Sequence, residues 1–388
     1  MGYNKNNIMI TNRSRTINVL IVDDSPTVCQ LISAVLENEP DLHVIGVATN
    51  GQEGVQMARM MHPDVITMDI NMPVMGGLDA TRYIMRDAPT PIVIVTADFG
   101  RKDIDLTFEA LNAGALTVVK KPGLMDQESN VNLVQTVRNM AGVPVVRRWF
   151  RGPQTGGLSP NTLALAEFRA TVKGIQRLQF VQVVGIAAST GGPSVLETIL
   201  RPLSENFPLP ILIVQHITNG FASGMADWLN NNTRLNVRLA SHGEPARPGT
   251  ALIAPEGYHM MLNTKGYIEL SHDAPQNGFR PSANILFHTL ASSFGRRAIG
   301  IILTGMGDDG ADGLDAMHRL GSLTIAQDEE TSTVYGMPAE AARRGAADLI
   351  LNPDQISTLL AQLERKTGSL QSGDASSYTA GTRPLTSR

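Results

Sequence analysis

Residues 17–24 read INVLIVDD, a short apolar run that ends in two aspartates. Four further runs of this kind follow: HVIGVA at 43–48, DVITMD at 64–69, PIVIVTA at 91–97 and LTVVKK at 116–121. Helical patterns lie between them, including one that Ser25 would cap and Pro26 would begin. Strands that alternate with helices predict an α/β fold, a doubly wound five-stranded parallel sheet with helices on both faces.

Polar side chains fall at the carboxyl ends of these predicted strands, namely Asp23, Asp24, Asp69, Thr96 and Lys121. In an open α/β sheet those ends converge on one crevice. Crowded carboxylates repel one another and favour a hard dication such as Mg²⁺. One acid would stay free as a nucleophile toward a phosphoryl donor, with Lys121 and the Thr96 hydroxyl ready to bind the transferred group. The alternative is a set of acidic turns with caps and surface pairs.

A second alternating pattern starts near residue 180, and its clearest predicted strands are FVQVVGIAA at 180–188, LPILIVQH at 209–216, TALIAP at 250–255 and AIGIILTGMG at 298–307. The first strand breaks into a glycine-rich turn and a helix. Ser189 therefore stands at a sharp junction beside free backbone N–H groups, which are donors for an oxyanion. His216 ends the second strand and Asp309 follows the last, so the three side chains can meet at the edge of one parallel sheet.

A serine needs a base to accept its proton, and the imidazole needs a carboxylate to orient it, so this trio suits acyl transfer. The pattern departs from G-x-S-x-G, and the order Ser, His, Asp differs from that of α/β-hydrolases. Asp308 is an adjacent carboxylate that spacing does not separate from Asp309. The alternative is a tight or phosphate-binding turn with an ordinary strand-end histidine.

Composition limits the class of protein. The chain has 388 residues, enough for two cores, with 42% hydrophobic and 18% charged residues, which is typical of soluble globular proteins. A net charge of -4 predicts no broad attraction for nucleic acid. The single Cys29 excludes an intrachain disulfide and is interpreted as a small buried residue. No signal peptide or apolar run of ~20 residues is recognisable, so we expect a cytoplasmic protein.

The connecting segments are less regular. NLVQTVRNMAG at 132–142 predicts a last helix of the first domain, and RRWFRGPQTGGLSP at 147–160 is rich in Gly and Pro. Its arginines around Trp149 and Phe150 favour a solvated linker over a nucleic-acid site. The expected organisation is a flexible N-terminal tail at 1–16, a first domain at 17–135, a linker at 136–178, a second α/β parallel-sheet domain at 179–365 and a disordered tail at 366–388.

The motifs VDDS, MDINMP, VTA and KKP resemble the receiver domain of bacterial response regulators, which has a flavodoxin-like fold. The resemblance implies that Asp69 is phosphorylated and that Asp23, Asp24, Asp69 and the backbone carbonyl of Asn71 bind Mg²⁺. It also implies that Thr96 and Lys121 are switch residues. Val118 occupies the position three residues before Lys121 where many receivers carry an aromatic switch residue.

The segments GIAASTGGP, VQH, RPSANILF and LTGMGDDGADG look like the catalytic domain of the chemotaxis protein-glutamate methylesterases of the CheB family. The resemblance implies that Ser189 is the nucleophile, His216 the general base and Asp309 the orienting acid. Oxyanion contacts are implied at Thr190 and the Met306 backbone N–H. Arg280 would orient an acidic or polar substrate or form a structural salt bridge. The remaining histidines are interpreted as ordinary loop or helix-surface residues: His242, His259, His272, His288 and His318.

The implied reaction is hydrolysis of glutamate γ-methyl esters on chemoreceptors, with deamidation of receptor glutamines as a second activity and no cofactor for either. A CheA-type histidine kinase is the implied phosphodonor, and phosphorylation would release a receiver that blocks the hydrolase. A DNA-binding output is disfavoured because no basic helix-turn-helix pattern is present. A phosphorylation-dependent scaffold without turnover remains the alternative.

Overall fold

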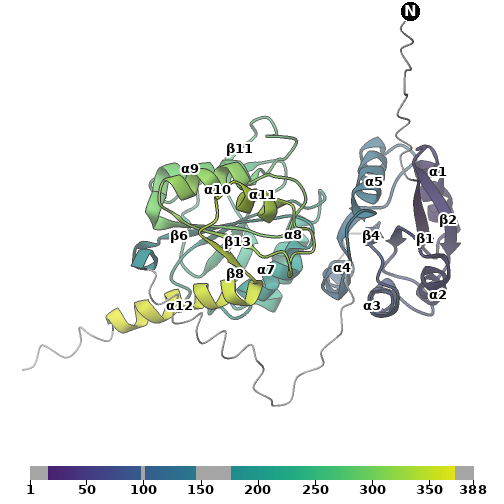
Figure 1. Ribbon diagram of the computed structural model, residues 1–388, viewed down its shortest axis with the longest axis horizontal. Coiled ribbons are helices and arrows are strands. Elements are labelled where there is room, and N and C mark those ends of the chain that lie inside the picture. The colour runs from purple at the N-terminus through teal and green to yellow at the C-terminus, as the bar shows by residue number, and fades with distance from the viewer. Residues whose placement is uncertain (1–15, 98–100, 146–175, 372–388) are drawn as a thin grey trace, which may run out of the picture. The chain divides into compact units, whose positions relative to one another are not determined.

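The structure of the protein is a computed structural model, and it describes residues 16–97, 101–145 and 176–371. The chain divides into two compact units, each with its own core (Figure 1). Most of the expected tails and of the expected linker, including Trp149 and Phe150, lies outside the described residues. In the described part of the chain no helix is long and apolar enough to cross a membrane.

The first unit contains the predicted five-stranded parallel sheet, in the order β2-β1-β3-β4-β5. Helices α1 and α5 lie on one side of the sheet and α2 and α3 on the other (Figure 1). The strands are β1 (Ile17–Val22), β2 (Leu42–Ala48), β3 (Val65–Met68), β4 (Ile92–Thr96) and β5 (Thr117–Lys120). The helices that follow these strands along the chain are α1 (Pro26–Glu37), α2 (Gly51–Met61), α3 (Gly77–Asp87), α4 (Arg101–Ala113) and α5 (Gln127–Met140).

A local sequence signal accounts for the start of α1, and packing accounts for the length of α5. The Ser25 hydroxyl accepts from the backbone N–H of Val28, and Pro26 opens α1, so the predicted cap is confirmed. Helix α5 continues beyond the domain boundary expected at residue 135. Val137 and Met140 are buried on its inner face, and this packing keeps the last turn helical.

Within residues 176–371, the second unit contains a seven-stranded parallel sheet in the order β14-β13-β12-β6-β7-β9-β8, and β10 and β11 form a separate antiparallel pair. The strands are β6 (Val183–Ala188), β7 (Ile211–Gln215), β8 (Asn236–Leu239), β9 (Thr250–Ile253), β10 (His259–Leu262), β11 (Ile268–Ser271), β12 (Ala298–Ile302), β13 (Leu323–Gln327) and β14 (Leu349–Leu351).

The helices of this unit are α7 (Gly192–Leu200), α8 (Ala222–Asn232), α9 (Ala283–Phe294), α10 (Ala311–Arg319), α11 (Met337–Arg343) and α12 (Pro353–Gln371), with short 3-10 turns η1 (Gln176–Phe180) and η2 (Gly295–Arg297). Helix α12 therefore extends into the segment expected to be a disordered tail from residue 366.

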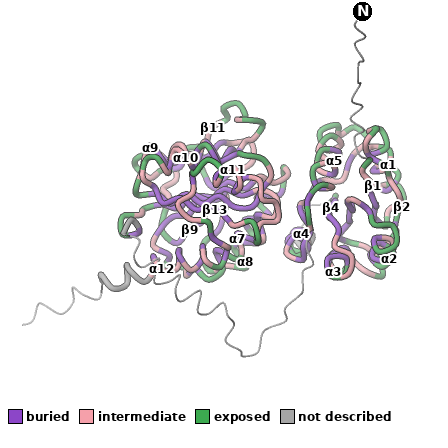
Figure 2. The backbone as a smooth tube through the Cα atoms, viewed as in Figure 1, coloured by how far each residue is buried: buried purple, intermediate pink, exposed green. Residues whose placement is uncertain are grey.

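The core of the second unit lies between the sheet and the helices that cover it. The residues of β6, β7, β12 and β13 are buried along their whole length, and Figure 2 shows these central strands enclosed by more exposed elements. Phe287 and Leu290 of α9 and Leu314 of α10 are fully buried in the same cluster. Burying such side chains contributes about 2 kcal/mol each. The fold thereby fixes the carboxyl ends of β6, β7 and β12, the three strands that precede Ser189, His216 and Asp309.

Candidate functional site

The acidic residues predicted at the first sheet's carboxyl edge do gather there. Carboxylate oxygens of Asp23, Asp24 and Asp69 lie within 4.8 Å of one another. Asp23 and Asp69 are buried and Asp24 is exposed. The Lys121 ammonium lies 2.7 Å from Asp23 and 3.1 Å from Asp69. Three closely spaced carboxylates fit a hard dication, since Mg²⁺ prefers oxygen ligands.

Burial and charge act against each other in this cluster. Burial raises the pKa of Asp69, and the nearby Asp23 charge adds to that effect, while Lys121 offsets part of it. For Lys121, burial alone would lower the pKa, but the hydrogen bond to Asp23 and the charge of Asp69 raise it overall. The lysine therefore keeps its positive charge beside a partly desolvated carboxylate.

The other predicted receiver residues follow the same edge. Thr96 is buried at the end of β4, and its carbonyl accepts from the Lys121 backbone N–H at 2.8 Å. Asn71 is exposed two residues beyond Asp69. Val118 is buried within β5, and its aliphatic side chain has no ring that could act as an aromatic switch. This backbone hydrogen bond links Thr96 directly to Lys121 at the ends of the paired strands β4 and β5.

In the second unit, Ser189 directly follows β6 and His216 directly follows β7, and these two strands are neighbours in the sheet. Ala188 of β6 is the register partner of Gln215 of β7, and the His216 backbone N–H donates to the Ala188 carbonyl at 2.9 Å. The Ser189 N–H donates to the carbonyl of Thr304 at 3.0 Å, and Thr304 lies two residues past β12, the strand on the other side of β6. The two side chains therefore project from neighbouring positions on one sheet edge.

Asp309 is bound to His216 and enclosed by the start of α9. His216 Nε2 lies 2.9 Å from Asp309 Oδ2, and the carboxylate is 1% exposed. It also accepts from the backbone N–H groups of Ala283 at 2.7 Å and Asn284 at 3.1 Å, and from the Ser282 hydroxyl at 2.8 Å. Burial raises the pKa of Asp309, but the hydrogen bond to His216, the charge of that ring and the donors of Ala283 and Ser282 outweigh it, so the net pKa lies below the ordinary value.

This environment distinguishes Asp309 from Asp308. Asp308 is exposed, whereas Asp309 points inward to the imidazole. The Asn284 side chain supports the same loop, because its Oδ1 accepts from the N–H groups of Gly310 at 3.0 Å and Gly313 at 2.8 Å. In the RPSAN segment at 280–284 only Arg280 was expected to contribute to the site. Its Ser282 and Asn284 bind the Asp309 carboxylate and the loop that carries it. A serine or asparagine at a helix start is read from sequence as a cap, so this role was missed.

The ring of His216 has two different surroundings. Nε2 faces Asp309, while Nδ1 is buried and has no hydrogen-bond partner among the described residues. Phe279 stacks on the ring, with centroids 4.2 Å apart and planes 13° from parallel. Sequence reasoning missed Phe279 because it belongs to an irregular loop far from His216 in the chain. Nδ1 is therefore the ring atom that is left available to accept a proton.

The turn that carries Ser189 is closely packed. Gly191 has φ +78°, and a Cβ there would lie 2.3 Å from Thr333 Oγ1, so a side chain does not fit. The Thr304 hydroxyl donates to the Thr190 carbonyl at 2.9 Å. Gln215, also missed by sequence reasoning, donates from Nε2 to the carbonyls of both Ser189 and His216 at 2.8 Å. One amide thus ties the two strand ends together.

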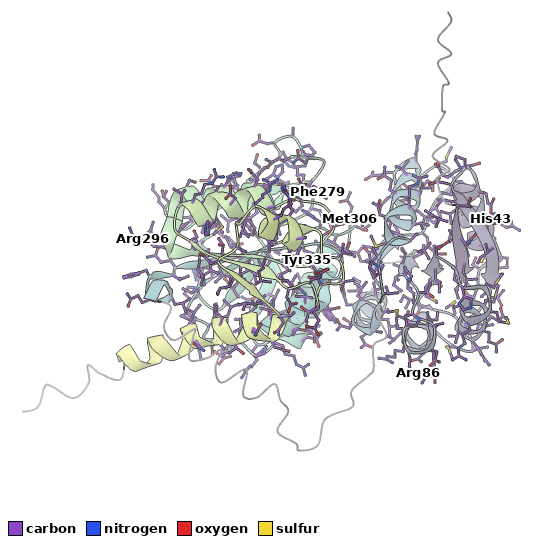
Figure 3. The ribbon with its side chains drawn as sticks, in the orientation of Figure 1. His43, Arg86, Phe279, Arg296, Met306 and Tyr335 are labelled. Atoms are coloured by element: carbon purple, nitrogen blue, oxygen red, sulfur yellow. The ribbon has the colours of Figure 1, made fainter. Side chains whose placement is uncertain are left out.

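The remaining predicted contacts lie around this edge. Thr190 follows Ser189 directly, and Met306 is half-buried two residues after Thr304. Figure 3 shows Phe279, Met306 and Tyr335 on the side of the unit away from Arg296. Arg280 donates to the backbone carbonyls of His272 at 3.1 Å and Asp273 at 3.2 Å. The guanidinium is therefore anchored to the loop that carries Phe279.

One histidine prediction is wrong. His259 is not a surface residue: it is 1% exposed within β10, because its ring fills space between that strand and Ser282. The other histidines are exposed or half-buried, as expected, and each makes a local contact: His242 with Leu270, His272 with Gly257, His288 with Asp312 and His318 with Thr324.

Comparisons with known proteins agree with both halves of the chain. The family model "Response regulator receiver domain" matches residues 19–133, and "CheB methylesterase" matches residues 184–360. A "Protein-glutamate methylesterase/protein-glutamine glutaminase 1" of Syntrophus aciditrophicus is 44% identical over 89% of this chain and 98% of its own length. A protein of Nitrosospira multiformis with the same name, without the number, is 42% identical over 92% and 99%. The crystal structure of the Thermotoga maritima CheB methylesterase catalytic domain is 35% identical, with a TM-score of 0.46, and covers 47% of this chain and 98% of that one.

A receiver sheet followed by a parallel-sheet hydrolase defines a response regulator with an enzymatic output. The chain belongs to the CheB methylesterase family. The resemblances inferred from sequence are confirmed, and family membership favours an enzyme over a scaffold without turnover.

Replacing Asp23 tests the acidic cluster. We expect Asp23→Asn to weaken Mg²⁺ binding by about tenfold or more, because it removes one of three adjacent negative charges. Isothermal titration calorimetry measures the affinity. Asp79→Asn is the matched control, since Asp79 is an exposed carboxylate of the same unit that pairs with Arg82. Equal affinities for the two variants would contradict the site.

The pKa of Asp309 makes a prediction about stability. Because that pKa lies below 3.8 in the folded chain, the ionised group stabilises the fold above this pH, and the effect is lost as pH falls through the lower folded value. Asp309→Asn should therefore cost about 3 kcal/mol near pH 6, and less below pH ~4. Chemical denaturation at several pH values measures the difference, with Asp308→Asn as control. A difference that grows toward acid pH would be inconsistent with this assignment.

Proposed function

We propose that this chain hydrolyses glutamate γ-methyl esters of chemoreceptors and deamidates receptor glutamines, under control of phosphorylation at Asp69. The observation that carries the proposal is the buried Asp309 bonded to His216 at 2.9 Å, one strand away from the Ser189 turn. The names of the relatives support the same substrates.

Ser189 is the proposed nucleophile and His216 the general base. The Ser189 Oγ attacks the ester carbonyl while Nδ1 of His216 takes its proton, since Nε2 is engaged by Asp309. Asp309 stabilises the imidazolium that results. Backbone N–H groups at Thr190 and Met306 are the proposed donors to the oxyanion. The imidazolium then returns its proton to the leaving group, which departs as methanol and leaves an acyl-enzyme.

Water completes the reaction. His216 removes a proton from a water molecule, whose oxygen attacks the acyl carbon, and the proton passes to Ser189 as the glutamate carboxylate leaves. A glutamine substrate follows the same course and releases ammonia. No cofactor enters these steps. Arg280, fixed on the loop that carries Phe279, is proposed to orient the acidic or polar substrate.

In the receiver, Asp69 is the proposed phosphoryl acceptor, with a CheA-type histidine kinase as donor. Asp23, Asp24 and Asp69, together with the Asn71 carbonyl, would hold Mg²⁺, which neutralises charge on the incoming phosphoryl group. Lys121 already bridges Asp23 and Asp69, so it can move to the new charge. Thr96 and Lys121, joined through their backbones, are the proposed switch residues.

Replacing the nucleophile tests the enzyme. Ser189→Ala should abolish methanol release from methylated chemoreceptor membranes, a loss of at least ~10³-fold, because no acyl-enzyme can form. Release by the wild-type chain should rise when a small phosphodonor and Mg²⁺ are added. Ser194→Ala in helix α7 is a matched control whose hydroxyl is not part of the proposed triad. Release that survived in Ser189→Ala would favour the scaffold alternative.

Removing the receiver tests the regulation. If the unphosphorylated receiver blocks the hydrolase, residues 176–371 alone should release methanol faster than the unphosphorylated full chain, and phosphodonor should not accelerate them further. The second unit has its own core, so it is a reasonable piece to produce. Initial rates at equal concentrations measure the effect. Equal rates would contradict inhibition by the receiver.

A further inference from the structure

Ser282 occupies the N-cap position of α9 but does not cap that helix. A serine at this position normally accepts from a backbone N–H in the first turn of its own helix. Here no side-chain cap bond is present, and the hydroxyl donates instead to Asp309 Oδ1 at 2.8 Å. Asp309 takes over the capping, because it accepts from the N–H groups of Ala283 and Asn284. The start of α9 is therefore built around a carboxylate from another element.

A second buried histidine holds Ser282 in place. His259 Nδ1 accepts from the Ser282 backbone N–H at 3.2 Å, and its Nε2 lies 3.2 Å from the Ala274 carbonyl. A carbonyl only accepts, so the proton sits on Nε2, and Nδ1 is free to accept from Ser282. Both side chains are almost completely buried. A continuous chain of hydrogen bonds thus runs from β10 through Ser282 and Asp309 to His216.

We propose that Ser282 is a positioning residue for the catalytic carboxylate, that its hydroxyl fixes Asp309 and sets the proton affinity of His216, and that His259 acts by holding Ser282. The inference rests on the proposed function and deepens it. Sequence and family resemblance drew attention to this segment through Arg280, whereas the contacts assign the role to the serine two residues later.

The expected effect has a definite sign. The Ser282 hydroxyl donates a hydrogen bond to Asp309 and so offsets part of the negative charge of the carboxylate. Without this bond the carboxylate attracts the protonated form of His216 more strongly. The pKa of His216 should therefore rise, and the acid limb of kcat/KM should move to higher pH. Asp309 is the ionisable side chain bonded to this ring, Phe279 covers its face, and the adjacent Gln215 is neutral. The exposed Asp308 is unchanged by the substitution.

The test compares two serines at the same helix in the full chain. Ser282→Ala should lower kcat for methyl-ester hydrolysis by about tenfold with little change in KM, since one hydrogen bond to a charged group is lost. Ser292→Ala is the matched control, because Ser292 is exposed on α9 and its hydroxyl bonds within that helix. Ser282→Thr, which keeps the hydroxyl, should restore both the rate and the acid limb.

His259 provides the second arm. His259→Leu removes the atom that accepts from the Ser282 N–H and should shift the acid limb as Ser282→Ala does. His259→Asn puts an amide oxygen at about the position of Nδ1, so it keeps an acceptor and should stay closer to wild type. If His259 acts through Ser282, adding His259→Leu to Ser282→Ala should lower kcat little further. Fully additive losses would overturn this part of the proposal.

A measurement without substrate separates this inference from the proposed function. The pKa of His216 is read by NMR of ¹³C-histidine-labelled chain, with the signal assigned by His216→Gln. A rise in Ser282→Ala, but not in Ser292→Ala, supports the role of Ser282 even if wild type released no methanol, an outcome that would refute only the methylesterase proposal. An unchanged His216 pKa and acid limb in Ser282→Ala would overturn the inference, as would a loss of rate that Ser282→Thr failed to restore.

Discussion

The hydrogen bond between Asp309 and His216 is the interaction on which the second unit's site depends. A carboxylate that is 1% exposed would ordinarily become neutral, since burial disfavours its charge. Here the His216 ring, together with the N-terminus of α9 and the Ser282 hydroxyl, keeps the group ionised. The charge is thus fixed next to the imidazole before any substrate arrives, which is the form of preorganisation that acyl transfer requires.

The receiver also has a buried aspartate at the carboxyl edge of its sheet, but the pKa of this aspartate is shifted in the opposite direction. Asp69 is also buried, and its pKa is raised, because burial disfavours its charge and the nearby Asp23 repels it. Lys121 offsets this only in part. Added positive charge would stabilise such a carboxylate, whereas Asp309 already accepts hydrogen bonds from Ser282, Ala283 and Asn284. The surroundings of the two buried acids therefore shift their pKa values in opposite directions.

Several supporting residues connect segments that lie far apart in the chain. Gln215 binds the carbonyls of Ser189 and His216, and Thr304 holds Thr190. These neutral contacts fix the spacing of the strand ends without adding charge near the proposed nucleophile Ser189. The glycines of the turn allow this close packing, because a Cβ at Gly305 would lie 2.7 Å from that of Ser189.

Sequence alone predicted the five-stranded sheet, four of the seven strands of the second sheet, the acidic cluster and the candidate Ser, His, Asp set, because strand ends in a parallel sheet converge by topology and these strands are visible as apolar runs. It also determined the family, through motifs such as MDINMP and LTGMGDDG. Only the tertiary structure separated Asp309 from Asp308, buried His259, stacked Phe279 on His216 and turned the Ser282 hydroxyl toward Asp309. These features depend on contacts between distant segments, and a local pattern carries no record of which side chain another element will place against it.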